Sequence, residues 1–156
     1  APGFGAELLF EDPFVVIARA GHPRLKRGVA LDLYLSLDHV SLTWSRDHET
    51  SPLIQRLGQL GIKRRIKYSV PTAASLPSIV AGKLAKKGDR VAAGDVICTM
   101  TMRMARAFSK HYGIEIHELP SSLPPLPVYM VWHQGFDRDE GHRWLRATVK
   151  EIASQL

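Results

Sequence analysis

Apolar residues recur along this chain in two patterns, one typical of strands and one typical of helices. Short runs of β-branched, aromatic and other apolar residues predict strands at 8–10, 14–18, 39–44, 65–70, 96–100, 114–119 and 128–133. Pro13 marks a bend between the first two. Residues 31–37 form a short mixed segment.

Between these runs, apolar residues three or four positions apart predict helices. The helices begin after Ser51, Thr72, Thr101 and Asp137, and the first three end at Gly61, Gly82 and Gly113. Ser51 and Thr101 are predicted caps, and glycine is a common helix terminator. The last helix carries a predicted buried stripe of Leu145, Val149, Ile152 and Leu156.

Strands that alternate with helices predict a largely parallel sheet with helices on both faces. Ligands bind such sheets at the carboxyl ends of the strands. Three of these ends are rich in hydroxyl groups and precede helices: residues 43–45, 70–72 and 99–101. That combination suits an anionic ligand such as a carboxylate, but the same hydroxyls also suit helix caps. For the three strand ends together, the pattern does not decide between an anion-binding site and simple helix caps.

Composition narrows the choice of protein class. With 156 residues, 45% of them hydrophobic and 23% charged, the chain predicts one globular domain with a core. The longest apolar run, residues 14–18, is far shorter than the roughly 18 residues that a membrane span needs. A single cysteine, Cys98, fits a reducing compartment, and its apolar neighbours indicate a buried packing group.

The net charge of +6 raises the question of nucleic-acid binding. The basic clusters at 63–67 and 83–90 are not interleaved with aromatic residues, so we expect solvated basic faces. The histidines are scattered and no nucleophile or phosphate-loop motif occurs, so we expect no catalysis, no metal and no cofactor. Trp44, Trp132 and Trp144 are expected to pack in a core or between lobes.

Several stretches in order along nearly the whole chain resemble a known family. They are residues 9–18 followed by Gly21-His22-Pro23, then 38–40, 57–62, 70–82, 102–108 and 126–133 before the last helix. Together they resemble the effector-binding domain of LysR-type bacterial transcription regulators. The resemblance implies an α/β, periplasmic-binding-protein-like (type 2) fold of two lobes. Residues 1–156 would be a partial domain, with 13–119 as the second lobe and 1–12 and 120–156 as the crossover and return to the first.

The resemblance also implies a function. A small effector, carboxylate-bearing or aromatic, would bind between the lobes of a cytoplasmic homo-oligomer, a dimer or tetramer, and control transcription. By position, the second-lobe effector-binding residues would be Thr43, Ser45, Pro71, Thr72, Ala73 and Thr101. DNA would be bound only by a winged helix-turn-helix upstream of Ala1, and no membrane partner is expected.

Residues 83–95 depart from the family pattern and form an atypical inserted loop. With residues 96–98 they resemble half of a biotinyl or lipoyl carrier hairpin, but no lysine stands where a carrier would be modified. Two alternatives to a sensor stay open. One is an extracytoplasmic solute-binding protein of the same fold. The other is a fragment that only dimerises, through an exposed apolar face on its last helix.

Overall fold

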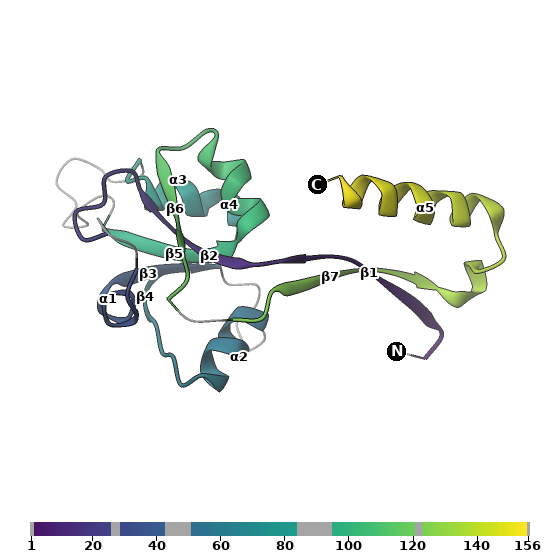
Figure 1. The fold of residues 1–156 in the computed structure, drawn as a ribbon, viewed down its shortest axis with the longest axis horizontal. Coiled ribbons are helices and arrows are strands. Elements are labelled where there is room, and N and C mark those ends of the chain that lie inside the picture. Colours follow the sequence, from purple (N-terminus) through teal and green to yellow (C-terminus); the bar gives the residue numbers. More distant parts are fainter. Residues whose placement is uncertain (1, 26–28, 43–50, 84–94, 121–122, 156) are drawn as a thin grey trace. The chain divides into compact units, whose positions relative to one another are not determined.

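The computed structural model describes residues 2–25, 29–42, 51–83, 95–120 and 123–155. The chain divides into two compact units (Figure 1). Unit 1 combines Ala1–Asp12 with Pro125–Leu156, and unit 2 is Pro13–Pro124. Each unit is described by itself below.

Unit 2 contains a five-stranded sheet in the order β4-β3-β5-β2-β6. Its strands are β2 (Phe14–Arg19), β3 (Asp38–Leu42), β4 (Arg65–Val70), β5 (Val96–Thr101) and β6 (Ile114–Glu118). β3 runs parallel to β4 and β5, whereas β2 is antiparallel to β5 and β6. The largely parallel sheet expected from the sequence is therefore found, with β2 as its reversed strand.

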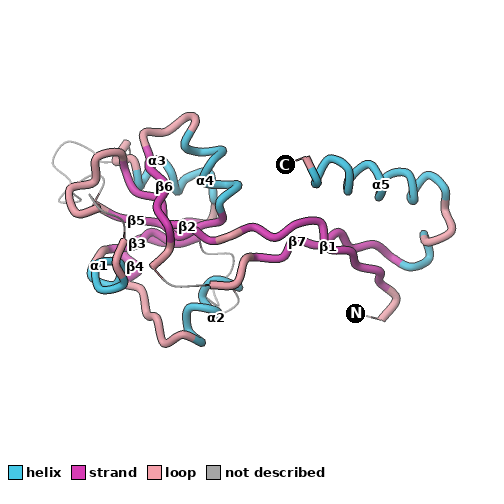
Figure 2. Tube along the Cα trace, in the orientation of Figure 1, coloured by secondary structure: helices cyan, strands magenta, loops and turns pink. Residues whose placement is uncertain are grey.

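Helices cover both faces of this sheet, as predicted (Figure 2). They are α1 (Leu31–Ser36), α2 (Pro52–Gln59), the 3-10 turn η2 (Ala73–Ser75), α3 (Leu76–Val80) and α4 (Met102–Ser109). Val15 and Ile17 of β2 pack with residues of α3 and α4, and Val16 and Ala18 pack with Tyr34 of α1. This division follows from the alternation of side chains along a strand.

The structure defines one local expectation more closely and corrects another. The mixed segment at 31–37 forms α1, a helix without a side-chain cap. Ser51 and Thr101 do stand at N-cap positions, but neither side chain makes a capping hydrogen bond. Two of the predicted helix ends fit the structure well. Gly61 and Gly82 follow α2 and α3 with φ angles of 69° and 73°, which glycine adopts without strain.

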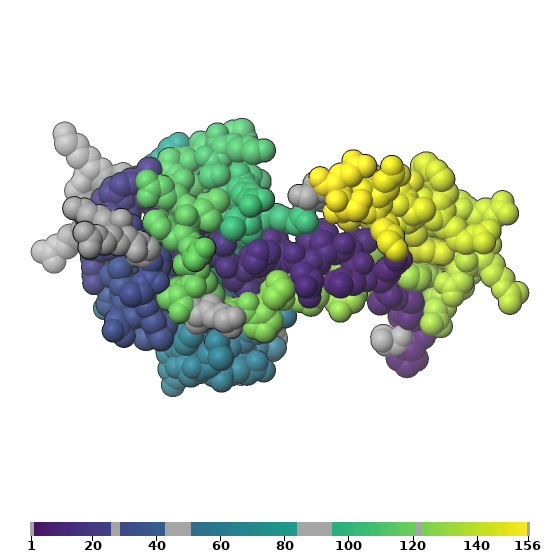
Figure 3. Space-filling view, viewed as in Figure 1, coloured from purple at the N-terminus to yellow at the C-terminus, as the bar shows by residue number. Residues whose placement is uncertain are grey.

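Unit 1 consists of an antiparallel two-stranded ribbon and a helix. The ribbon pairs β1 (Phe4–Asp12) with β7 (Leu126–His133), and the register shifts between Leu8 and Phe10. After the 3-10 turn η3 (Gln134–Phe136), α5 (Glu140–Ser154) begins at Asp139, whose carboxylate accepts a hydrogen bond from the His142 amide at 2.6 Å. Lys150 of α5 pairs with Glu7 of β1. Figure 3 shows α5, in yellow, against the purple β1 strand.

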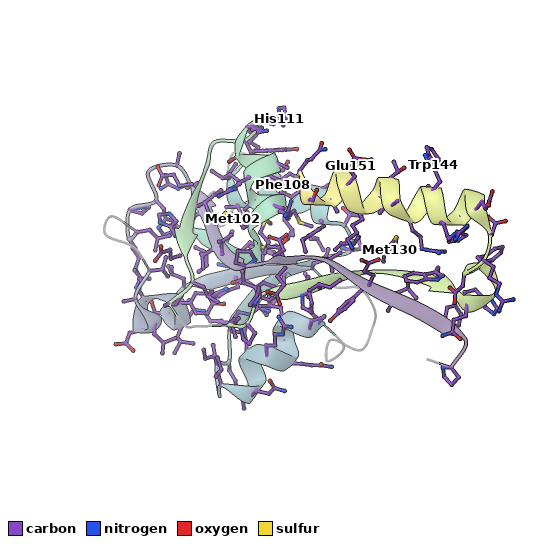
Figure 4. The ribbon with its side chains drawn as sticks, turned by 45° about the vertical axis from the view of Figure 1, so that its right-hand side comes forward. Met102, Phe108, His111, Met130, Trp144 and Glu151 are labelled. Carbon is purple, nitrogen blue, oxygen red and sulfur yellow. The ribbon has the colours of Figure 1, made fainter. Side chains whose placement is uncertain are left out.

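The predicted buried stripe of α5 is largely wrong. Leu145 and Ile152 are 50% and 55% exposed, Val149 is half-buried, and Leu156 lies outside the described residues. Trp144 is 69% exposed, so it does not pack in the core of unit 1, and its expected position between lobes stays a prediction. It lies on the side of α5 that faces away from the ribbon (Figure 4). The physical reason is that two strands offer α5 too little surface to cover an apolar stripe.

Trp132 of β7 has a defined environment within unit 1. Its indole Nε1 donates a hydrogen bond to the Asp137 carboxylate at 2.6 Å. The Arg146 guanidinium lies 4.7 Å from the centre of the ring. These contacts connect the ribbon, the following turn and α5, and leave the ring half-buried.

Candidate functional site

The carboxyl ends of β3, β4, β5 and β6 lie at one edge of the sheet in unit 2, where the antiparallel β2 begins. The register places Thr101 opposite Phe14, and Val70 opposite Leu42. Because β3 stands between β4 and β5, the ends of β4 and β5 are about 10 Å apart. We refer to this part of unit 2 as the carboxyl edge.

Four of the six predicted effector-binding residues lie at the carboxyl edge. Pro71 and Thr72 follow β4 and are exposed, whereas Ala73 at the start of η2 is half-buried. Thr101 ends β5 and is also half-buried. The other two, Thr43 and Ser45, lie outside the described residues.

The two threonine hydroxyls at this edge differ in their contacts. Thr72 Oγ1 and the Ser75 hydroxyl lie 3.0 Å apart and share a hydrogen bond. Thr101 is the N-cap of α4, but its side chain does not bond to the helix. The first amide of α4, that of Met102, donates instead to the Pro13 carbonyl at 2.8 Å. The Thr101 hydroxyl therefore stands beside the helix start without capping it.

A second group of polar residues is buried in the middle of unit 2. Tyr34 Oη and Thr99 Oγ1 lie 2.8 Å apart, and His39 Nε2 lies 2.9 Å from the Tyr34 carbonyl oxygen. The Tyr34 and His39 rings meet edge to face, with centroids 4.6 Å apart. Burial raises the pKa of Tyr34 and lowers the pKa of His39 to about 4. These groups are neutral near pH 7 and hold α1 on the sheet.

Cys98 lies beside this group and is 1% exposed. Burial raises the pKa of its thiol to about 12, so the thiol stays protonated and unreactive. This agrees with its expected role as a packing group. Within the described ranges, no three side chains of the metal-binding types come together.

A hollow of unit 2 lies between α2 and the β3–β4 pair, and we call it the α2 cavity. Its volume is about 630 Å³. Apolar walls come from Ile54 and Leu57 of α2, from Ile62, and from Ile66 of β4. Ser41 and Ser69, which are opposite each other in the β3–β4 register, add two hydroxyl groups.

Two cations also line the α2 cavity, Lys63 and Arg64. The next two basic residues along the chain, Arg65 and Lys67, form ion pairs with Asp38 at 2.5 and 2.8 Å. Hydrogen bonding from Lys67 lowers the pKa of that carboxyl. Arg64 is partly buried, which corrects the expectation of a wholly solvated basic face. Its Nη1 atom is buried and has no hydrogen-bond partner.

The α2 cavity is not predictable from the sequence pattern. Two of its apolar residues, Ile54 and Leu57, belong to the predicted apolar face of a helix, and Leu57 is indeed buried, at 2% exposure. The strand sequences show the alternation that places Ser41 and Ser69 on one face of the sheet. They do not show the distance between that face and α2. The loop at 83–95, apart from its two end residues, lies outside the described residues. Of those ends, Asp95 pairs with Arg19 at 3.7 Å.

Comparison with known proteins identifies relatives along nearly the whole chain, although no protein-family model matches it. The HTH-type transcriptional activator NagR of Ralstonia sp is 28% identical over 155 residues, which cover 98% of this chain and 47% of NagR. Nodulation protein D 2 of Sinorhizobium fredii is 28% identical over 148 residues, 95% of this chain and 44% of that protein. The chain thus spans just under half the length of these relatives.

Solved structures share the fold. A putative transcriptional regulator from Vibrio parahaemolyticus superposes with a TM-score of 0.78 and 21% identity over 99% of this chain and 67% of that one. The effector-binding domain of QuiR, in complex with shikimate, has a TM-score of 0.69 and 13% identity over 99% and 67%. The regulatory domain of MetR, a LysR family regulator from N. meningitidis, has a TM-score of 0.67 and 12% identity over 98% and 65%.

Proposed function

This chain is homologous to LysR-type transcription regulators and has the fold of their regulatory domains, and we propose that it is a ligand-sensing part of such a regulator. In this role it binds a small carboxylate-bearing or aromatic effector and so controls transcription. The observation that carries the proposal is the match to transcription regulators in sequence and to effector-binding domains in fold, each over nearly the whole chain.

The division of the chain supports an assignment of its lobes. Unit 2 has a complete sheet with helices on both faces, as the second lobe would. Unit 1, with its two strands and one helix, corresponds to the crossover and to part of the first lobe. The proposed effector-binding domain in the full protein is therefore larger than residues 1–156.

We place the effector at the carboxyl edge of unit 2. The hydroxyls of Thr72 and Thr101 donate to the effector's carboxylate, and Pro71 and Ala73 contact its apolar part. Thr43 and Ser45 belong to the same proposed set. The partial positive charge at the N-terminus of α4 favours an anion beside Thr101. No step of this function is catalytic.

The proposed partners follow from the same homology. The regulator is a homo-oligomer in the cytoplasm, and it binds DNA through a winged helix-turn-helix outside residues 1–156. Within the described ranges, none of the helices has the length and apolar character of a membrane span.

The first test is to determine the coding sequence upstream of residue 1. We expect a winged helix-turn-helix followed by the rest of the first lobe. A secretion signal joined directly to a first lobe would instead identify an extracytoplasmic solute-binding protein.

The second test concerns the site. Calorimetric titration with shikimate and benzoate measures the affinity for cyclic and aromatic carboxylates. Thr72→Val and Thr101→Val each remove one hydroxyl at constant shape, and each should weaken binding about tenfold. Ser109→Ala is the matched control, because its hydroxyl bonds to the Arg106 carbonyl at the other end of α4. Equal affinities in all four proteins would refute the assignment of the carboxyl edge.

A further inference from the structure

The α2 cavity has the size and construction of a small-molecule site. Ligand pockets in proteins have volumes of about 300 to 1,000 Å³ and combine apolar walls with a few polar groups. The α2 cavity, at about 630 Å³, meets both conditions. Helix α2 borders it along one side with Ile54, Leu57 and Gly58, where the glycine contributes no side chain to fill the space.

The walls specify the chemistry of an occupant. All four large apolar lining residues are aliphatic: Ile54, Leu57, Ile62 and Ile66. Among the described lining residues, the aliphatic side chains offer an apolar chain a surface to pack on, and none is aromatic and able to stack on a ring. At the polar end, the Arg64 guanidinium donates a hydrogen bond to the Tyr34 hydroxyl. Its Nη1 atom is nevertheless buried without a hydrogen-bond partner, which is costly for a cationic donor. A carboxylate beside Arg64 would accept that hydrogen bond, with Lys63 as a second cation.

We propose that the α2 cavity is a second ligand site, which binds a small aliphatic carboxylate with its chain against the isoleucines and its carboxylate on Arg64. The hydroxyls of Ser41 and Ser69 supply further donors on the sheet side.

This site is separate from the carboxyl edge, because none of the described residues proposed for the effector (Pro71, Thr72, Ala73 and Thr101) lines the α2 cavity. Leu42 and Val70 pack with the α3–α4 core, and so does Ala73. Ser41 and Ser69, one position earlier in the strands, face the α2 cavity. A ligand at one site therefore does not occupy the other, and the second site does not depend on the proposed effector.

The cavity also lies where a ligand can act on α2. The helix is held at its middle by Arg56, whose guanidinium donates to the Pro124 carbonyl at 2.7 Å and lies 5.7 Å from the Phe14 ring centre. A ligand that fills the space between α2 and the β3–β4 pair adds contacts along the whole helix and restrains it.

The test is calorimetric titration of the whole chain with octanoate, below its micelle concentration. We expect one site per chain. Octanol and octylamine, of equal chain length, should bind at least tenfold more weakly, because they lack the anion. Arg64→Gln should weaken octanoate binding at least tenfold. Lys110→Gln, which removes an exposed cation after α4, is the matched control and should leave it unchanged.

A second variant keeps the test decisive if Arg64→Gln does not fold. A Cβ atom at Gly58 meets no atom within 4 Å, so Gly58→Leu can project into the cavity, and we expect it to abolish binding. Amide chemical shifts locate the ligand, and changes at α2 and β4 are expected. Equal affinity for octanol, full affinity in a folded Arg64→Gln, or shifts confined to Thr72 and Thr101 would overturn the proposal. Loss of shikimate binding in Thr101→Val with octanoate binding intact would show that the two sites are independent.

Discussion

The two units of this chain bury their apolar residues to different degrees. In unit 2 the interior strand β2 is covered on both faces, and Val16, Ile17 and Ala18 are fully buried. In unit 1, Ala153 is the one buried hydrophobic residue among those described. Most of the large exposed apolar side chains also belong to unit 1: Phe4, Leu8, Tyr129, Val131, Phe136, Trp144, Leu145 and Ile152.

The difference shows what a two-stranded ribbon lacks. A ribbon with one helix has a free face and two free edges, and three or more strands or further packing are needed for independent stability. Unit 2 contains its own core, so its stability is set by its own sequence. The stability of unit 1 in the full protein depends on what covers its exposed apolar residues. The predictions that follow test this contrast.

The largest effect is expected in the core of unit 2. Ile17→Ala removes three carbon atoms from a side chain that is 0% exposed and packed among β5 and α3 residues. Such substitutions cost about 4 kcal/mol, because a cavity is left behind. Urea unfolding followed by circular dichroism measures the loss. Val131→Ala in β7, which is 60% exposed, is the control and should change stability by less than about 0.5 kcal/mol.

A pH dependence should follow from His39. Burial lowers its pKa from 6.5 to about 4, so the folded protein keeps the ring neutral while the unfolded chain binds a proton below pH 6.5. Stability from this group is therefore complete above pH 6.5 and is lost as the pH falls toward 4. The loss is about 3 kcal/mol, from about 1.4 kcal/mol per pKa unit.

The control for this effect is His39→Gln, measured by urea unfolding at pH 7, 5.5 and 4. Burial also lowers the pKa of His22, which adds a loss of the same sign in both proteins. The difference between the two plots of unfolding free energy against pH, one for each protein, therefore isolates the contribution of His39. Parallel curves would mean that the His39 ring is not buried in its neutral form.

A moderate effect is expected in unit 1, at Gly5. A Cβ atom there would lie 2.6 Å from the Trp132 ring, so Gly5→Ala must displace the indole. The displacement strains the hydrogen bond to Asp137 and the contact with Arg146, and we expect a cost of about 1 to 2 kcal/mol within unit 1. Tryptophan fluorescence and hydrogen exchange of the β1 and β7 amides measure it. Exchange in β2 and β5 should stay unchanged.

Substitution of glycine by alanine should have the opposite effect on stability at Gly58 in α2. No atom lies within 4 Å of a Cβ there, and the position is helical. Gly58→Ala should therefore stabilise α2 by about 1 kcal/mol, because alanine loses less conformational entropy in a helix. Slower hydrogen exchange of the α2 amides would report it. A destabilised Gly58→Ala would show that α2 lies closer to the sheet than the α2 cavity allows.

The sequence predicted unit 2 better than unit 1 for a physical reason. The uninterrupted apolar run at residues 14–18 indicates burial on both faces, and β2 has both faces buried. The reversed direction of β2 depends on pairings between distant segments, and no local pattern shows them. For α5, the apolar stripe predicts a buried face but not a partner, and the structure leaves Leu145 and Ile152 exposed. The candidate sites follow the same rule. The strand ends near Thr72 and Thr101 were visible in the pattern, whereas the α2 cavity depends on the distance between α2 and β4.

The smallest effect on stability is expected at Trp144, the most exposed of the large apolar residues in unit 1. Trp144 is 69% exposed on α5, and its side chain is not among the core contacts of either cluster. Trp144→Ala should change the unfolding free energy of residues 1–156 by less than about 0.5 kcal/mol. Its effect should appear in association, because an exposed apolar patch promotes contacts between molecules. Sedimentation velocity over a range of concentrations should therefore show less self-association than in the unsubstituted chain, with Thr148→Ala on the same helix as the control. A cost above about 1 kcal/mol in a monomeric sample would contradict the comparison, since it would mean that Trp144 is already covered within the chain.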